Sequence, residues 1–353
     1  MRTSYLLAIV GLVIAGYFLA KIIRETDIAG SLQYIASIAP FSLAALFLIS
    51  IVGVFADTLG WHLLLPRENT RKNLWKMLRV RIVSEAVVST VPAGSIIADP
   101  LKAWLLKRAF GLTLACGSAS VALRTFLLAD AQSLLTIIVT LLSLPWLFQV
   151  SPDILSGAHY LAWLMLGASL AACCIYTILL YLGSHRASLD KLHRGLRKIR
   201  IGFLSTWIAK NERSFTDLRN ELAEFGGSQA YRLWISGGLY IVLWMTDAVE
   251  TYVLLRLLGI DIALGTAIEI EILCGFLRSI AFFVPSGIGL QDAAYLGFLK
   301  SIGASNPGAA AFILLKRMRQ LVWIVLGYGL LLTIRKVKWN LVAPGIADEQ
   351  AHH

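Results

Sequence analysis

Charged side chains interrupt the apolar stretches of this sequence, where a charge is costly and is therefore usually paired or functional. Six of them lie around two interruptions by proline and glycine, and these are the predicted substrate-binding residues: Glu85, Asp99, Arg124, Arg278, Asp292 and Arg317. Guanidinium groups bind phosphate oxygens through parallel hydrogen bonds, and carboxylates accept hydrogen bonds from ammonium or hydroxyl groups. These residue types suit a ligand that carries a phosphate together with other polar groups.

An alternative reading of the same residues is structural. Arg124 and Arg317 could simply neutralise Asp99 and Asp292 as buried bridges, and Glu85 and Arg278, each seven residues before a proline, could pair with each other. Other ionisable residues in apolar stretches could likewise contribute only to folding: Asp57, Asp130, Asp247, Glu250, Glu269 and Glu271.

The two interruptions are Val91-Pro92-Ala93-Gly94 and Val284-Pro285-Ser286-Gly287-Ile288-Gly289. Proline and glycine break a helix and free backbone groups, which hydrocarbon cannot satisfy, so such breaks must be buried in protein or line a wet cavity. Helix N-termini that follow the breaks would add backbone donors for an anion. The predicted breaks are Pro92, Gly94, Pro285, Gly287 and Gly289.

The surroundings of the two breaks also resemble each other in sequence. With a constant offset of 193 residues and no gaps, Pro92, Gly94, Asp99 and Arg124 align with identical residues in the second region. Interrupted segments in corresponding positions of two halves are typical of transporters with a site near the bilayer midplane. The alternative is coincidence, because a few identities are expected by chance between apolar windows. We expect two repeat halves, residues 40–148 and 231–335.

The elements that must position these residues are membrane helices. The chain has 353 residues, 58% of them hydrophobic and 15% charged, which is too apolar for a soluble domain of this size. Five apolar runs are long enough to cross a bilayer: 5–20, 41–65, 160–182, 233–258 and 309–334. The composition predicts one all-α, polytopic membrane domain over residues 1–350.

Charge sorting predicts the orientation of the chain in the cytoplasmic (inner) membrane of a bacterium. Basic stretches favour the cytoplasm, so both termini and the connector 183–230 are predicted to be cytoplasmic. With this sorting, the region near 82–107 begins and ends on the cytoplasmic side, and the region near 264–300 begins and ends on the outer side. We therefore expect both regions to be re-entrant hairpins, which enter the membrane from opposite faces. Within the connector, Leu189, Leu192, Leu196 and Ile199 lie opposite basic residues. That pattern fits an amphipathic helix on anionic lipid, or simply a solvated loop.

Several classes of function are not indicated by the sequence. The net charge of +11 follows the membrane sides, so we expect no nucleic-acid partner. The four cysteines and six histidines lack metal-ligand spacing, so no metal or other cofactor is expected. No G-x-x-x-x-G-K-[ST] phosphate loop occurs, which excludes that mode of ATP binding.

The segment from Val91 to Leu106, with Asp99-Pro100-Leu101-Lys102 at its centre, resembles the first signature of the lysylphosphatidylglycerol synthase membrane-region family, often called flippase-like. Arg124 resembles the arginine of the helix that follows, and the segment from Pro285 to Asp292 resembles the second signature, Pro-x-Gly-x-Gly-x-x-Glu. This chain departs from the family pattern with Asp99 and Asp292 in place of the usual glutamates. A shorter acid would alter the shape of a charged site without abolishing it.

The resemblance implies the handling of a lipid with a polar head, but not lysine transfer, because the soluble aminoacyl-transferase domain of the full-length synthases is absent from this chain. Stand-alone members include a hopanoid-associated branch and others that could serve glycolipids. The leading hypothesis is a flippase that moves a phosphate-bearing, hopanoid-type or glycolipid-type lipid, and its expected partners are polar-headed, anionic membrane lipids. The alternatives are an accessory subunit that docks lipid-biosynthesis enzymes, and an intramembrane lipid-phosphate transferase with an aspartate as general base.

Overall fold

The computed structural model describes residues 28–66, 73–91, 94–149, 158–184, 230–280 and 289–335, together with Val284 and Gly287. The regular elements in these ranges are helices, which confirms the all-α prediction. Five are long: α3 (Pro40–Leu63), α7 (Leu114–Gln149), α8 (Ala158–Ser184), α12 (Ala230–Leu257) and α15 (Asn306–Arg335). The shorter ones are α2 (Ile28–Ala36), α5 (Leu74–Thr90), α6 (Gly94–Phe110), α13 (Leu264–Ile280) and α14 (Leu290–Ser301).

Four of the described helices are long and apolar enough to cross a membrane: Pro40–Leu63, Leu114–Pro145, Ala162–Tyr181 and Ala230–Leu257. Three of them coincide with predicted runs, and the chain is accordingly a membrane protein. The fifth predicted run, 309–334, forms α15, which carries Lys316, Arg317 and Arg319 in its apolar sequence. The predicted run 5–20 and residues 185–229 of the connector lie outside the described residues.

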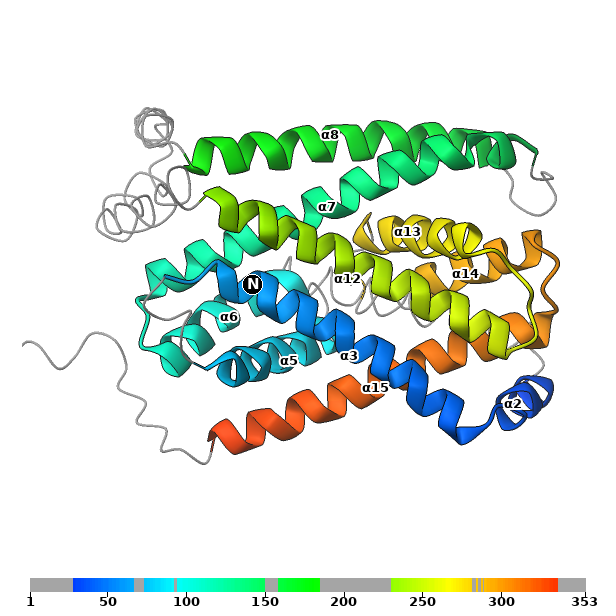
Figure 1. Cartoon of the computed structure of the whole chain (residues 1–353), viewed down its shortest axis with the longest axis horizontal. Helices are drawn as coiled ribbons and strands as arrows, with labels where there is room; N and C mark the ends of the chain where they lie inside the picture. Colours follow the sequence, from blue (N-terminus) through cyan, green and yellow to red (C-terminus); the bar gives the residue numbers. More distant parts are fainter. Residues whose placement is uncertain are drawn as a thin grey trace, which may run out of the picture.

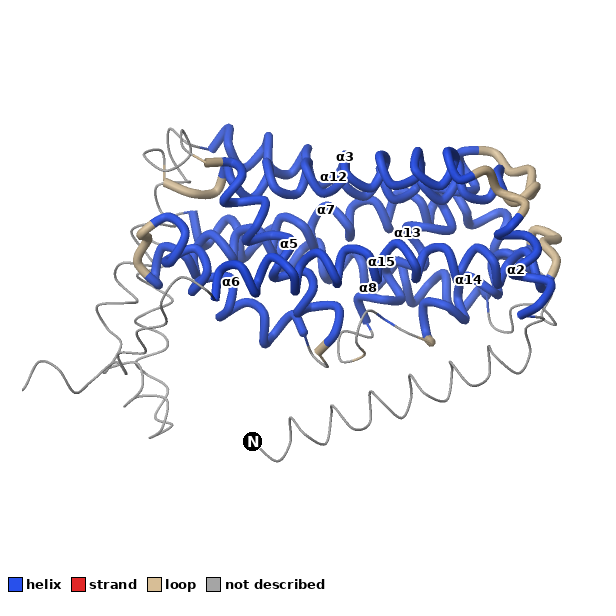
Figure 2. The backbone as a smooth tube through the Cα atoms, turned by 90° about the horizontal axis from the view of Figure 1, so that it is seen from below, coloured by secondary structure: helices blue, strands red, loops and turns tan. Residues whose placement is uncertain are grey.

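The long helices run roughly along the longest axis of the molecule, and the short helices fill its two ends (Figures 1 and 2). Helices α5 and α6 occupy one end, while α13 and α14 occupy the other. In each pair the interrupted ends point toward the middle of the molecule. Helix α8 packs along α7. Only 11% of its most apolar stretch is buried inside the protein, so α8 lies at the periphery.

Two close helix contacts hold the core together. Helix α3 packs along α12, where a Cβ on Gly60 would lie 2.9 Å from the ring of the fully buried Tyr240. Helix α15 packs along α5, where a Cβ on Gly327 would lie 2.7 Å from the carbonyl oxygen of Ile82. Glycine makes room for the tyrosine ring at position 60 and lets two backbones approach closely at position 327, as is common between membrane helices.

The same succession of elements occurs twice in the chain: a long helix, a short helix, a break, a short helix and a second long helix. We call α3, α5, α6 and α7 the first half, and α12, α13, α14 and α15 the second half. Helices α5 and α6 extend beyond the predicted 82–107, whereas α13 and α14 match 264–300 closely. That the two pairs are re-entrant hairpins of a true repeat stays a prediction.

Candidate functional site

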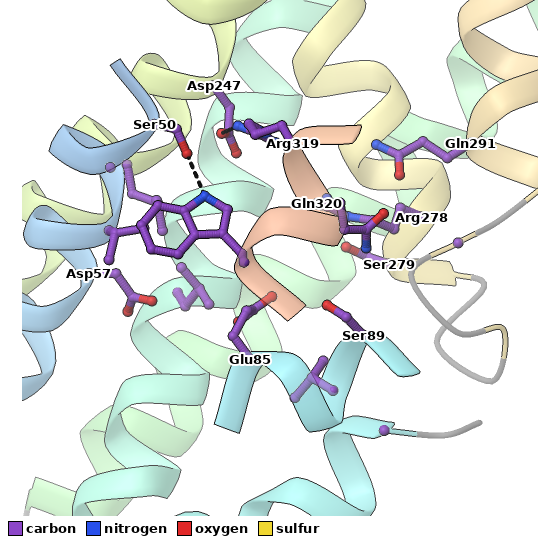
Figure 3. Close-up of a pocket in the computed structure, with 18 of the residues that line it drawn as sticks. Ser50, Asp57, Glu85, Ser89, Asp247, Arg278, Ser279, Gln291, Arg319 and Gln320 are labelled. Atoms are coloured by element: carbon purple, nitrogen blue, oxygen red, sulfur yellow. Dashed lines mark hydrogen bonds and ion pairs between the residues drawn. The ribbon is translucent and has the colours of Figure 1, made fainter. Parts of the chain in front are cut away.

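A cavity of about 430 Å³ lies between the two halves and is lined by residues of both (Figure 3). All six predicted substrate-binding residues line it, although they come from six different helices. Further charged residues of the lining are Asp57, Arg81, Lys102, Asp247, Glu271, Lys316 and Arg319. The cavity therefore concentrates charge inside a bundle whose outer surface is largely apolar.

Asp57 of α3 is the centre of the first half's strongest ion pairs. Its carboxylate is 1% exposed and accepts hydrogen bonds from Arg124 Nε at 3.0 Å and Nη2 at 2.8 Å. Arg81 of α5 donates to the same carboxylate at 2.8 Å. The guanidinium of Arg124 also lies over the ring of Trp61, 5.1 Å from its centroid. Three helices are thus joined through one buried acid.

The structural alternative paired Arg124 with Asp99, and this pair is not formed. Asp99 instead pairs within α6, where Lys102 Nζ lies 2.7 Å from its carboxylate. Glu85 of α5 has a looser contact: its carboxylate is 3.9 Å from Arg81, and its side chain is 40% exposed. Residues one turn apart on a helix can reach each other without any tertiary contact, so Asp99 is free to take this local partner.

In the second half the pair proposed by the structural alternative does form. Arg317 of α15 donates to Asp292 of α14 from Nε at 3.0 Å and from Nη2 at 2.6 Å. The other oxygen of Asp292 accepts the backbone N–H of Gly289 at 2.9 Å. Asp292 therefore caps the start of α14, as acids commonly do in the first turn of a helix, and also ties it to α15.

Helix α15 carries two more cations that meet a group of acids. Arg319 pairs with Glu250, and its Nη1 lies 3.3 Å from Asp247. Lys316 Nζ lies 3.0 Å from Glu271, whose carboxylate also accepts a hydrogen bond from the hydroxyl of Tyr295 at 3.0 Å. These contacts join α12, α13 and α14 to α15.

Arg278 of α13 differs from the other basic residues of the cavity. Among the described residues no carboxylate lies within ion-pair distance of its guanidinium, which instead lies 5.7 Å from the centroid of the Trp244 ring. The pair between Glu85 and Arg278, an alternative to substrate binding by these residues, is not formed, although both residues line the same cavity. Figure 3 shows them on opposite sides of it, with Gln320 and Ser279 near Arg278 and Ser89 near Glu85.

The helices end at the predicted breaks. α5 ends at Thr90 and α6 begins at Gly94, where a Cβ would collide with the carbonyl group of Val88. Gly287 and Gly289 have φ values of 61° and 86°, which L-residues with side chains rarely adopt. Pro92 and Pro285 lie outside the described residues. The two breaks thus need glycine for different reasons: close approach in the first and positive φ in the second.

The sequence prediction missed the residues that bind the predicted arginines. Asp57 was recognised as an ionisable residue in an apolar stretch but was not placed in the site, and Lys102, Lys316 and Arg319 were not considered for it. The pattern Lys316-Arg317-x-Arg319 within an apolar run was an available signal, because three cations at membrane depth require nearby acids.

Comparison with known proteins supports the resemblance noted from the motifs. The family model described as "Lysylphosphatidylglycerol synthase TM region" matches residues 8–329, which is nearly the whole chain. No curated protein matches the sequence. The matched range contains both breaks and all the cavity-lining residues. The chain therefore belongs to the lysylphosphatidylglycerol synthase TM region family.

Proposed function

We propose that this chain moves a polar-headed lipid across the cytoplasmic membrane, with the head group passing through the charged cavity while the acyl chains stay in lipid. The observation that carries the proposal is the cavity itself, which is lined by charges from both halves. Charges at membrane depth are expensive to bury, and in transporters they mark the path of the substrate. Family membership supports a role that involves membrane lipids.

Within this proposal, Arg124 and Arg317 do not bind the phosphate by themselves, because part of their hydrogen-bonding capacity is already used within the protein. Each guanidinium already donates two hydrogen bonds to an aspartate. Arginine has five N–H donors, so Arg124 retains N–H groups for a ligand, whereas Arg317 also donates to Gln320 at 2.7 Å. We place the head group against the remaining donors of Arg124 and against the side chains with the weakest protein contacts, Glu85 and Arg278.

The competing function for the same cavity is an intramembrane transferase, because Asp99 and Asp247 in the cavity wall supply carboxylates that such an enzyme could use as a general base. Neither cysteine nor histidine occurs among the described residues that line it, so a Cys–His or Ser–His pair for nucleophilic catalysis is not assembled there. The accessory-subunit alternative relies on the basic connector, most of which lies outside the described residues. The cavity favours transport over both.

The test is lipid exchange in liposomes that contain the purified protein and a trace of lipid labelled on an acyl chain. Thr125→Trp places a large ring in the cavity, whereas Leu142→Trp places the same ring on the outer surface of the same helix, where Leu142 is 71% exposed. We expect exchange with the wild type and Leu142→Trp, and strongly reduced exchange with Thr125→Trp. Equal exchange by both variants would show that the cavity is not the path.

A chemically altered lipid recovered from the same liposomes would favour the transferase. Size-exclusion profiles of the two tryptophan variants verify that both remain folded. If the wild type gives no exchange of any lipid and the cell retains the chain in a stable complex with biosynthetic enzymes, the accessory subunit is the better description.

A further inference from the structure

The charges around the cavity divide into well-paired clusters and two residues with weak contacts. In the first half, Asp57 binds Arg81 and Arg124, which leaves this cluster with one excess positive charge. In the second half, Asp247, Glu250 and Glu271 bind Lys316 and Arg319, which leaves one excess negative charge. The pairs Asp99–Lys102 and Asp292–Arg317 are neutral.

Glu85 and Arg278 restore neutrality in their own halves. Glu85 supplies the negative charge that the first cluster lacks, with its nearest cation, Arg81, 3.9 Å away. Arg278 supplies the positive charge that the second cluster lacks, and its electrostatic attraction to Asp247 acts without direct contact. These described acidic and basic side chains are therefore equal in number, and an empty cavity is neutral overall.

Glu85 and Arg278 occupy equivalent positions in the two halves, 193 residues apart in the alignment that relates the breaks. Equivalent positions in a repeat usually carry the same type of residue, whereas these carry opposite charges. Both residues face the cavity from helices that precede a break, α5 and α13. The cavity therefore has an anion with weak protein contacts, Glu85, on one side and a cation with weak protein contacts, Arg278, on the other (Figure 3).

Arg278 is held in place by contacts that do not neutralise it. Its side-chain stem lies against the second break, because a Cβ on Gly287 would be 2.8 Å from Arg278 Cγ. The ring of Trp244 supports the guanidinium, and the neighbouring Ser279 donates to Gln132 at 2.9 Å. A cation fixed by packing in this way loses little freedom when it binds an anion.

We propose that Glu85 and Arg278 are the specificity-determining pair of the cavity, and that they select a lipid head group of zero net charge with one phosphate and one ammonium. Arg278 binds the phosphate and Glu85 accepts hydrogen bonds from the ammonium. This inference rests on the proposed function and narrows it to a class of substrate. A zwitterion replaces two weak contacts without adding net charge to the cavity, whereas a net anion or net cation leaves one charge uncompensated inside an apolar helix bundle.

The experiment compares three acyl-labelled lipids in liposomes of one background composition: phosphatidylethanolamine, phosphatidylglycerol and the lysyl ester of phosphatidylglycerol. Their head groups carry net charges of about 0, −1 and +1 at neutral pH. We expect the wild type to exchange the zwitterionic lipid about tenfold faster than either of the others. Labelling the acyl chain leaves each head group intact.

Single variants are expected to shift this preference in opposite directions. Glu85→Gln leaves the cavity positive and shifts the preference toward phosphatidylglycerol, while Arg278→Gln leaves it negative and shifts the preference toward the lysyl lipid. Glu269→Gln and Arg79→Gln change the charge of the protein in the same way, on the same two helices, but lie outside the cavity. These controls are expected to keep the wild-type preference.

Lipid retention in detergent separates failure of this inference from failure of the proposed function. We expect the purified wild type to retain zwitterionic over anionic lipid relative to the membrane, and Glu85→Gln to reverse that ratio. Retention with this pattern but no exchange supports the specificity pair and refutes transport. Exchange with a wild-type preference for a charged lipid, or with a preference unchanged in both variants, overturns the specificity pair and leaves transport standing.

Discussion

The two halves of the molecule use the same sequence positions to make different contacts. In the second half, Arg317 binds Asp292 of the adjacent short helix. In the first half, the equivalent Arg124 binds Asp57 of α3, and the equivalent Asp99 turns to Lys102 of its own helix. The short helix α14 is thus tied to the long helix that follows it, whereas α6 has no such tie through Asp99. Similar residues at similar positions do not guarantee similar partners.

The largest expected loss of stability follows from the removal of the Asp57 carboxylate. Asp57→Ala leaves the guanidinium groups of Arg81 and Arg124 without their buried partner, so we expect a loss of about 3–5 kcal/mol of stability. Thermal unfolding of the detergent-solubilised protein, followed by size exclusion, measures the change. A shift no larger than that of Asp130→Ala, an acid outside the cavity on α7, would contradict the central role of Asp57.

The next effect is at Asp292, whose truncation removes both the cap of α14 and the bond to Arg317. Arg317 is 23% exposed and can be partly rehydrated, so we expect Asp292→Ala to cost about 1.5–3 kcal/mol. Asp292→Asn keeps an acceptor for the N–H of Gly289 and should recover part of that loss. If Asn and Ala behave identically in the unfolding assay, the cap contributes nothing.

The glycines of the two breaks provide a third contrast. Gly287→Ala imposes a positive φ on a residue with a Cβ, which costs about 1–2 kcal/mol. At Gly94 the obstacle is the backbone of Val88, so a larger side chain should be worse than alanine. We therefore expect Gly94→Val to be more destabilising than Gly94→Ala. At position 287 the added Cβ also comes 2.8 Å from Arg278 Cγ, but that side chain is flexible, so we expect a smaller difference between Gly287→Val and Gly287→Ala. Denaturant midpoints of the purified variants would reveal a reversed order.

The smallest expected effect is at Asp99. Its partner Lys102 is on the same helix, and the Asp99 side chain is 36% exposed, although Lys102 is only 8% exposed. A buried lysine, unlike an arginine, can lose its proton when its acid is removed, so Asp99→Ala should cost less than Asp292→Ala, about 1 kcal/mol. The same unfolding assay ranks Asp57, Asp292 and Asp99 under one substitution. An Asp99 variant as unstable as the Asp292 variant would mean that the two halves are more alike in their energetics than in their contacts.

Much of the architecture was predictable from the sequence because it depends on local properties. Apolar runs specify membrane helices, and Pro92-Ala93-Gly94 specifies the end of one helix and the beginning of the next, since both effects act within a few residues. The presence of Asp292 and Arg317 in the site followed from their positions around the second break. The cavity gathered all six predicted residues because both breaks point toward the middle of the molecule.

The choice of ion-pair partners was not predictable in the same way. Asp57 reaches Arg124 only because α3 lies against α12 and near α7, and nothing in the sequence around Asp57 indicates that packing. Asp99 had two cations available, and the nearer one along its helix prevailed. Local chemistry therefore identifies which residues need a partner, while the three-dimensional packing decides which partner each one receives.

The position of the cations on α15 has a consequence for how the chain enters the membrane. A basic residue at the centre of an isolated spanning helix costs about 2.5–3.5 kcal/mol to insert, and α15 contains Lys316, Arg317 and Arg319. Their acidic partners lie on α12, α13 and α14, all of which are synthesised earlier. Asp57 likewise precedes Arg81 and Arg124. The order of synthesis therefore delivers each carboxylate to the translocon before the cations that depend on it.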